Sequence, residues 1–444
     1  MKKLISKLGF DEKTFIHFFL IVSNSQMIYA FYDLKSVLYD PLLETLNVTN
    51  TEFGVLLGLV GLVTTFGGAA VGWLQDRFSI RKVLAVNSFM YGAWALIMAL
   101  WPGCPYELKC LFFIAIGFNG DAMYWAIVLK SVRIIAREDR QATAFGMLEC
   151  GRAIWAFLLS SLSVILYTVL GSTVFGMQTV MGINGTITIL SGLVIWMFIP
   201  EQLGRQSAEQ KAEATLSADN NEVTKGKTRK AFDGLIRALK MPEVWMTGGS
   251  AMCIYAVSCA AFTYFAPYLK NAYFLPAALV GVFGVFNGAG MRIVAGPVAG
   301  IITDMKFKSS AHMMKTCHIG VFLLLVVALL LPKKETFIIP AMVCLIVITL
   351  LVSLVRSVYY APIGELGIPE EMSAAVMAIA ACIGYSPSFW AYPLYGWLID
   401  QFEAAKAYSI IFAVLLVMTF TGAILNMALG KKIVARRERI ACAK

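Results

Sequence analysis

The stretch GWLQDRFSIRK at residues 72–82 decides the fold, because a degraded copy follows at residues 300–308 as GIITDMKFK. Gly72 and Gly300 lie 228 residues apart, and the aspartates four positions after them have the same separation. Each copy follows a long apolar run and contains basic residues. One loop motif at the same place in both parts of the chain indicates two parallel repeats.

The composition places both repeats in a membrane. Of the 444 residues, 59% are apolar and only 14% are charged, whereas soluble domains average about 25% charged residues. A membrane helix needs about 20 mostly apolar residues. The apolar content is therefore enough for twelve such helices and leaves no room for a soluble domain of ordinary size. It excludes a disordered chain, a disulfide-rich secreted module and an ordinary soluble enzyme.

The order of apolar and polar segments predicts an all-α membrane protein with two pseudo-symmetric six-helix bundles. Apolar runs bounded by charges, Gly or Pro predict twelve transmembrane helices at 14–42, 53–75, 83–101, 108–136, 141–169, 176–199, 244–270, 277–302, 312–331, 336–362, 371–398 and 407–429. We expect a first bundle over residues 1–200 and a second bundle with a basic tail over 243–444. Residues 201–242 are expected to form a cytoplasmic linker that ends in a helix on the membrane surface.

The positions of lysine and arginine predict the orientation. With the N-terminus inside, the inner segments hold 26 of the 37 basic residues and the outer loops hold five. Such an excess is typical of cytoplasmic segments, so both termini are expected in the cytoplasm. The net charge of +10 then reports orientation and does not indicate binding to nucleic acid.

The loop at residues 72–82 resembles the signature loop of the major facilitator superfamily, G-x-L-x-D-R-x-x-x-R-K. The matching residues are Gly72, Asp76, Arg77, Arg81 and Lys82, and Ser79 stands where that family usually has Gly. The second copy keeps Gly300, Asp304 and a basic Lys306. The resemblance covers the whole chain and implies a transporter in the cell membrane, which is the inner membrane in a bacterium.

Two roles are open for this loop. A glycine lets helices approach closely, and an aspartate beside an arginine can form contacts that latch one conformation and break in another. We expect this gating role for Gly72, Asp76, Arg77, Arg81 and Asp304. The alternative is a charged inner loop that only anchors the topology.

A narrower resemblance points to a bacterial subgroup related to organic-anion and sugar-phosphate transporters, the anion:cation symporters. It rests on residues 356–365 (RSVYYAPIGE), on Lys130 and Arg133, and on residues 146–152 (GMLECGR). In that subgroup an acidic residue often precedes Gly-Gly-Arg, and Cys150 replaces the first of those glycines here. Some members of the subgroup accompany sulfosugar breakdown.

Charged residues inside the predicted helices indicate the substrate class, since each costs at least about 2.5–3.5 kcal/mol to insert. The basic ones are Lys130, Arg133, Arg152, Arg292 and Arg356, and the acidic ones are Asp121, Glu149 and Glu365. Asp33 and Lys35 on the first helix are taken to cancel. The remaining net charge of +2 favours an anion, and arginine matches carboxylate, phosphate or sulfonate.

The expected substrate-binding residues are basic and aromatic, and the expected proton-coupling residues are acidic. The first set is Arg152, Arg292, Lys130, Arg356, Tyr32, Tyr124, Trp125 and Tyr359, and the second is Asp121, Glu149 and Asp33. Simpler alternatives stay open. Glu149 and Arg152 can pair within one helix, and Lys130 and Arg133 can extend to the inner interface, Arg133 more readily. Glu365 can lie in a loop, and Asp121 can be a partner for a nearby base.

We therefore expect a secondary transporter that moves a small organic anion by alternating access, with proton-coupled symport favoured over anion exchange or export. An enzyme is the least favoured class, because the three histidines at positions 17, 312 and 318 do not share a face that would bind a metal. The sequence contains no ATP-binding loop of the G-x-x-x-x-G-K-[ST] type. No cofactor, metal or nucleic acid is expected, and the partners are the substrate, a proton or counter-anion, and the lipid bilayer around a monomer.

Overall fold

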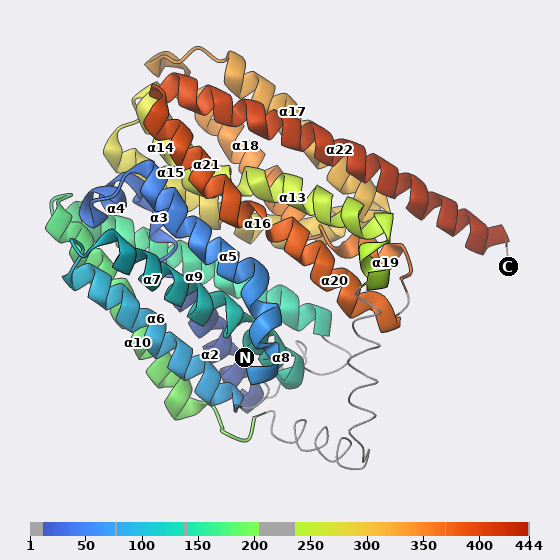
Figure 1. The fold of residues 1–444 in the computed structure, drawn as a ribbon, viewed down its shortest axis with the longest axis horizontal. Helices are drawn as coiled ribbons and strands as arrows, with labels where there is room; N and C mark the ends of the chain where they lie inside the picture. Colours follow the sequence, from blue (N-terminus) through green and yellow to red (C-terminus); the bar gives the residue numbers. More distant parts are fainter. Residues whose placement is uncertain (1–11, 76–77, 137–140, 204–235, 369, 443–444) are drawn as a thin grey trace.

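The computed structural model describes residues 12–75, 78–136, 141–203, 236–368 and 370–442, and these form helices joined by turns and short loops. Figure 1 shows two groups of long helices lying side by side along one axis. The first group runs from α2 to α10 and the second from α13 to α22. We refer to these groups as the first and second halves. The exact boundaries of the two bundles, expected at residues 200 and 243, stay a prediction.

Eleven helical segments in the described part of the chain are long and apolar enough to cross a membrane. The chain is thus an all-α, multi-pass membrane protein, as its composition predicts. The first predicted helix, over residues 14–42, is wrong as a single element. The structure divides it into α2 (Glu12–Met27), a turn, α3 (Leu34–Val37) and α4 (Tyr39–Leu46).

The other helices of the first half follow the predicted spans closely. They are α5 (Asn50–Gln75), α6 (Ile80–Leu100), α7 (Tyr106–Gly117), the π-helical turn η1 (Phe118–Ala122), α8 (Trp125–Ile135), α9 (Gln141–Val169) and α10 (Val174–Phe198). Helix α6 packs along α10. Small residues allow this approach, because a Cβ on Gly92 would lie 2.6 Å from the carbonyl oxygen of Gly185.

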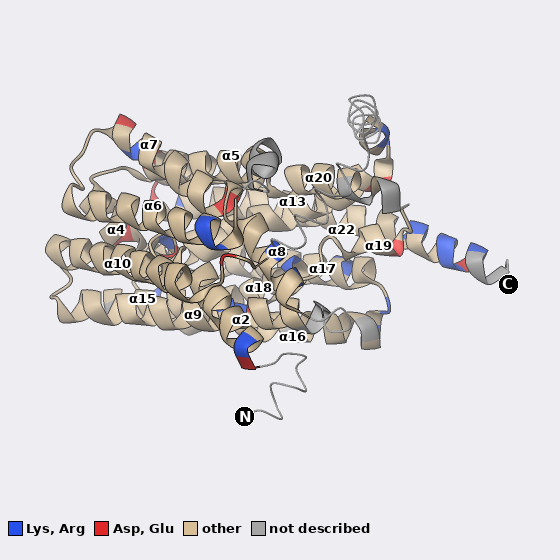
Figure 2. Ribbon diagram, turned by 90° about the horizontal axis from the view of Figure 1, so that it is seen from below, with Lys and Arg blue, Asp and Glu red and all other residues tan. Residues whose placement is uncertain are grey.

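The second half contains more interruptions. Its first elements are α13 (Pro242–Thr263), α14 (Phe265–Tyr273), α15 (Ala277–Val285), the π-helical turn η3 (Phe286–Gly290), α16 (Met291–Ile302) and a second π-helical turn, η4 (Thr303–Phe307). They are followed by α17 (Ser310–Leu330), the short 3-10 turn η5 (Glu335–Phe337), α18 (Ile338–Arg356), α19 (Ala361–Glu365), α20 (Glu370–Tyr385), α21 (Pro387–Gln401) and α22 (Ala404–Cys442). Helix α22 is 39 residues long, and Figure 2 shows lysines and arginines on its protruding last turns.

Helices α5 and α21 form a major contact between the two halves. Glycines line the α5 side of this contact. A Cβ on Gly58 would lie 2.9 Å from the carbonyl oxygen of Phe389, and one on Gly61 would lie 2.7 Å from the Phe389 nitrogen. Any side chain there would meet backbone, so glycine is what allows the two helices to touch.

Polar contacts join the halves at the end of the molecule that carries α4 and α14, which we call the far end. The Asp400 carboxylate accepts hydrogen bonds from the backbone N–H and side-chain hydroxyl of Thr51, both at 2.6 Å. It also accepts from the Asn50 side-chain amide at 2.8 Å. Asp400 thereby caps the N-terminus of α5 from the other half, and Lys270 forms an ion pair with Asp40 nearby.

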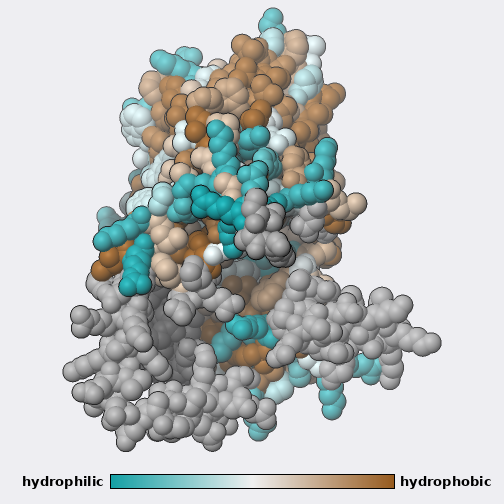
Figure 3. All heavy atoms as spheres, turned by 90° about the vertical axis from the view of Figure 1, so that its right-hand side faces the viewer, coloured by the Kyte–Doolittle hydropathy of each residue, from teal (hydrophilic) through white to brown (hydrophobic). Residues whose placement is uncertain are grey.

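The opposite end carries α19, the start of α13 and the end of α22, and we call it the linker end. Seen from this side, the molecular surface is hollowed between the two halves (Figure 3). Glu365 organises the polar contacts here, since it accepts from the Ser310 backbone N–H at 2.7 Å and pairs with Arg437 at 3.2 Å. Glu365 is the last residue of α19 (Ala361–Glu365), so the alternative that it lies in a loop is wrong, and it does not line the cavity described below.

Candidate functional site

A cavity of about 200 Å³ lies between the two halves. Broken or distorted helices build much of its wall. The turn after α2 supplies Tyr29, Tyr32 and Asp33, η1 supplies Asp121, and η3 supplies Gly288. Turns of π-helix are frequent at functional sites, because the extra residue re-aims neighbouring side chains.

The two π-helical turns beside the cavity begin with the same three residues. Phe118-Asn119-Gly120 opens η1, and Phe286-Asn287-Gly288 opens η3. In both, the asparagine amide bonds a backbone carbonyl at 2.8 Å, that of Ala115 for Asn119 and that of Ala261 for Asn287. A short polar side chain that satisfies an exposed carbonyl is suited to stabilising such a turn inside a membrane.

Three cations face the cavity, and they come from both halves. They are Lys35 on α3, Arg292 on α16 and Arg356 at the end of α18. The Arg356 guanidinium lies over Tyr255 and Phe262, 5.1 and 5.3 Å from their ring centres. Among the residues that the structure describes, none of the three cations forms an ion pair.

Lys35 and Asp33 both line the cavity, and neither forms an ion pair with the other. The Lys35 ammonium lies 3.2 Å from the centre of the Tyr32 ring. The Asp33 carboxylate instead accepts a hydrogen bond from the Gln26 amide at 2.7 Å. Asp33 ends the non-helical stretch at residues 28–33 and Lys35 lies on α3, so their side chains have different partners.

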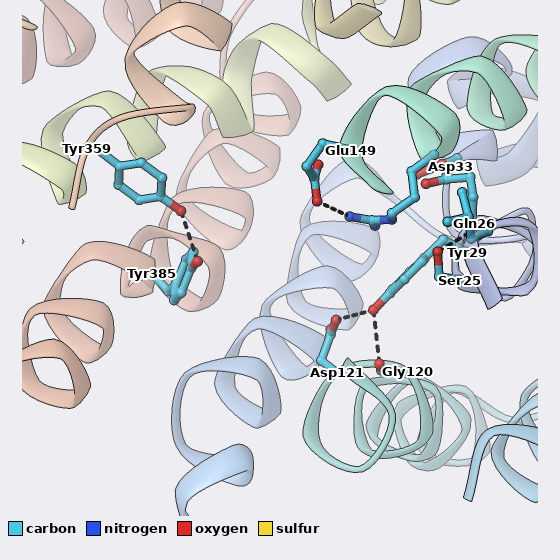
Figure 4. Close-up of polar contacts among 11 residues, drawn as sticks. Ser25, Gln26, Tyr29, Asp33, Gly120, Asp121, Glu149, Tyr359 and Tyr385 are labelled. Atoms are coloured by element: carbon cyan, nitrogen blue, oxygen red, sulfur yellow. Dashed lines mark hydrogen bonds and ion pairs between the residues drawn. The ribbon is translucent and has the colours of Figure 1, made fainter. Parts of the chain in front are cut away.

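Asp121 is the second carboxylate of the cavity wall. It accepts a hydrogen bond from the Tyr29 hydroxyl at 2.9 Å and another from the Thr64 hydroxyl at 2.6 Å. Figure 4 shows Tyr29 pointing at both Asp121 and the carbonyl of Gly120. Asp121 is therefore tied to the turn after α2 and to α5.

Arg152 is held beside the cavity and does not line it. Its guanidinium pairs with Glu149 at 3.1 Å within α9 and lies 4.4 Å from the Trp125 ring centre and 5.7 Å from that of Tyr29. The Glu149 side chain is 53% exposed. This arrangement matches the alternative of a pair within one helix.

The other expected substrate contacts lie away from the cavity wall. Tyr124 is fully buried in the first half and donates a hydrogen bond to Asn24. Tyr359 shares a 2.9 Å hydrogen bond with Tyr385, and Lys130 on α8 is not among the lining residues. Of the eight expected substrate-binding residues, Tyr32, Arg292 and Arg356 line the cavity.

Sequence reasoning missed several polar residues of the wall. Those it did not single out for the site include Lys35, Ser36, Thr64, Ser160, Ser388 and Tyr392. Hydroxyl residues are common in membrane helices and often bond their own helix, so only the three-dimensional arrangement identifies those that face the cavity.

The expected gating residues are described in part. Asp76, Arg77 and the side chain of Asp304 lie outside the described residues, and Gly72 is on the last turn of α5. Arg81 pairs at 2.7 Å with Glu201, which follows α10. Ser79, which replaces the usual glycine, caps α6 by accepting a hydrogen bond from the Lys82 backbone N–H.

Comparison with known proteins agrees with this architecture. The family profile of the Major Facilitator Superfamily matches residues 15–392. The chain belongs to the major facilitator superfamily. It is therefore a membrane transporter and not an enzyme.

Individual relatives of this superfamily member are distant in sequence. It is 28% identical to the inner membrane protein YihN of Escherichia coli over 433 residues, which covers 98% of this chain and 99% of that protein. It is 22% identical to the inner membrane protein YqcE of the same organism, with 84% of this chain and 85% of that one covered.

Solved structures show the same fold. A bacterial homologue of the human lysosomal transporter Spinster, in an inward-facing and occupied conformation, aligns with a TM-score of 0.71 and 11% identity over 94% of this chain and 97% of that one. The nucleoside transporter NupG aligns with a TM-score of 0.66 and 11% identity, over 93% and 99%. At these identities the likeness establishes the fold alone.

Proposed function

We propose that this transporter carries a small organic anion, such as a carboxylate, sugar acid, phosphate ester or sulfonate, across a bacterial inner membrane by alternating access. One observation carries the proposal. Three cations, Lys35, Arg292 and Arg356, face one cavity between the halves and form no ion pair among the described residues. The relatives named as inner membrane proteins support the location.

The charge of the cavity supports an anion. Its wall has these three cations and two carboxylates, Asp33 and Asp121. An unpaired cation at membrane depth is costly, and a bound anion offsets that cost. Since Lys35 comes from one half and both arginines come from the other, an anion held by them would bridge the two halves, as alternating access requires.

Coupling to protons is the favoured energy source, with Asp121, Asp33 and Glu149 as the acids that support it. Anion exchange is the second candidate, and the unpaired cations favour it, because an empty positive cavity would resist reorientation. Uptake driven by an imposed proton gradient distinguishes the two mechanisms, because such a gradient drives net uptake only in symport.

The predicted orientation completes the proposal. With the linker end at the cytoplasm, the structure is inward-facing, with its far end closed. We propose that Gly72, Asp76, Arg77, Arg81 and Asp304 act at the linker end as contacts that change during transport. The ion pair between Arg81 and Glu201 supports such a role by tying the start of α6 to the linker.

Ligand binding to the purified protein tests the substrate class. We expect thermal stabilisation by at least one of glucuronate, glycerol 3-phosphate, a hydroxyalkyl sulfonate and a short carboxylate, because a ligand stabilises the state that binds it. Glucose and choline are the neutral and cationic controls. Stabilisation by these controls and by none of the anions would contradict the proposal.

Uptake of the anion found in this way then tests the site. Arg292→Ala and Arg356→Ala are each expected to reduce uptake by about 10-fold or more, since a hydrogen bond to a charged group contributes about 1.5–3 kcal/mol. Arg237→Ala, on an exposed residue near the start of α13, is the matched control. Uptake at the wild-type rate by both cavity variants would overturn the assignment of these arginines.

A further inference from the structure

We infer that Asp121 is the reversible proton site of this transporter and that Thr64 and Tyr29 are positioning residues. The Thr64 hydroxyl changes its hydrogen-bond partner when Asp121 gains or loses a proton, and the Tyr29 hydroxyl holds the other carboxyl oxygen in both states. The inference rests on the proposed function. Of the three acids proposed for proton coupling, Asp121, Asp33 and Glu149, it selects Asp121. It also assigns a role to Thr64, which no sequence motif indicates.

The hydroxyls around Asp121 each contact two oxygen atoms. The Thr64 hydroxyl lies 2.6 Å from Asp121 Oδ2 and 2.9 Å from the Val60 carbonyl oxygen. The Tyr29 hydroxyl lies 2.9 Å from Asp121 Oδ1 and 2.9 Å from the Gly120 carbonyl oxygen. Each hydroxyl has a single hydrogen and therefore donates to only one of its two neighbours at a time.

This geometry provides a complete set of hydrogen bonds for either state of the carboxyl group. When Asp121 is ionised, Thr64 donates to Oδ2 and Tyr29 donates to Oδ1. When a proton from water binds Oδ2, the new O–H donates to the Thr64 oxygen, and the Thr64 hydrogen turns to the Val60 carbonyl. Release reverses these steps and returns the proton to water, with no other bond made or broken.

The other two acids lack partners of this kind. Asp33 receives its hydrogen bond from the Gln26 Nε2–H, which only donates, so the Gln26 amide would have to turn its oxygen toward Asp33 to accept a bond from the protonated acid. Glu149 pairs with the Arg152 guanidinium, which also only donates. Both contacts as they stand favour the ionised form, and protonation of Glu149 would leave it facing a group that only donates. Hydroxyl partners, which both donate and accept, distinguish Asp121.

Several other groups surround Asp121, and they must be compatible with a proton there. The titratable and charged groups near it are Tyr29 and Tyr32 from the turn after α2, Lys35 on α3, Tyr91 on α6, Arg152 on α9 and, across the cavity, Tyr255 on α13. The two cations are neither bonded to Asp121 nor paired with it.

Infrared difference spectroscopy of the full-length protein in lipid nanodiscs tests the inference without any ligand. As the pH is lowered, we expect a protonated-carboxyl band that Asp121→Asn removes. Thr64→Val should move its midpoint to higher pH by about one unit, because a charge-assisted bond to the carboxylate is lost. Tyr29→Phe should shift the band to higher frequency, because the hydrogen bond to Oδ1 is lost.

Neighbouring residues provide matched controls. Thr65 is the next residue on α5, and its hydroxyl bonds the Gly61 carbonyl instead. Tyr91 packs against Tyr29 with ring centres 6.4 Å apart, and its hydroxyl has no partner among the described residues. Thr65→Val and Tyr91→Phe should leave the band unchanged, and Thr64→Ser, which keeps a hydroxyl, should restore the wild-type midpoint.

The possible outcomes separate this inference from the function on which it rests. A band that persists in Asp121→Asn, or a wild-type midpoint in Thr64→Val, overturns the inference even if an anion is transported and Arg292 is required. A titrating band with the expected variant effects supports the inference even if every tested anion fails to bind, and in that case the proposed substrate class fails alone.

Discussion

Lys35 faces the cavity from α3, with its ammonium directly over the ring of Tyr32. We expect Lys35→Gln to reduce anion uptake by about 10-fold, because one charge-assisted contact to the substrate is lost. The measurement is uptake by proteoliposomes of the anion that stabilises the protein. Lys431→Gln, on the exposed surface of α22, is the control, and equal uptake by both variants would exclude Lys35 from the site.

At the residue scale, the sequence predicts which charged residues face the cavity better than it predicts which residues they contact. Arg292, Arg356 and Asp121 are recognisable because ionisable groups are rare inside membrane helices, and all three face the cavity. The sequence does not single out Lys35, because its charge is expected to cancel that of Asp33 on one continuous helix. Thr64 was missed because threonine is an ordinary residue in a membrane helix, and only its 2.6 Å contact with Asp121 marks it.

At the element scale, the contact of α5 with α21 depends on glycines without space for a side chain. A Cβ on Gly58 would lie 2.9 Å both from the Phe389 carbonyl oxygen and from Pro393 Cγ. Gly58→Ala should therefore lower the apparent melting temperature, since overpacking costs about 1–3 kcal/mol. Gly146→Ala is the control, because its Cβ would meet nothing within 4 Å, and alanine favours a helix over glycine by about 1 kcal/mol.

If Gly58→Ala melts at or above the temperature of Gly146→Ala, α5 and α21 can accommodate a methyl group at residue 58 at no cost in stability, and the prediction is wrong. Thermal melting monitored by intrinsic fluorescence compares the two variants directly. Both exchange a helical glycine for alanine, so the difference between them isolates the contact with α21.

The positions of the long helices could be predicted, but their interruptions only in part. Residues 263–267 (TYFAP) and 358–362 (VYYAP) share a pattern in which a proline follows the break, as expected because proline lacks the N–H of a helical bond. The break at residues 28–33 contains neither glycine nor proline. There, the Tyr29 contact with Asp121, 92 positions away in sequence, is a long-range interaction that local pattern does not reveal.

At the scale of the whole molecule, the hydrogen bonds from Asn50 and Thr51 to Asp400 join the two halves at the far end. Because the cap joins the two halves, its removal should favour the conformation in which that end is open. Asp400→Ala is expected to cost about 0.5–2 kcal/mol of closed-state stability, which raises the population of the open state by roughly 2- to 30-fold. Hydrogen–deuterium exchange should then increase in peptides that cover residues 47–53 and 398–403.

Glu403→Gln is the matched control for this last prediction, because Glu403 is an exposed acid three residues from Asp400 and its side chain bonds no described residue. Exchange at the linker end should fall in Asp400→Ala as exchange at the far end rises, because alternating access opens one end as the other closes. Faster exchange at both ends would instead indicate local loosening. Unchanged exchange at both ends would show that the contacts of Asp400 with Asn50 and Thr51 do not hold the halves together.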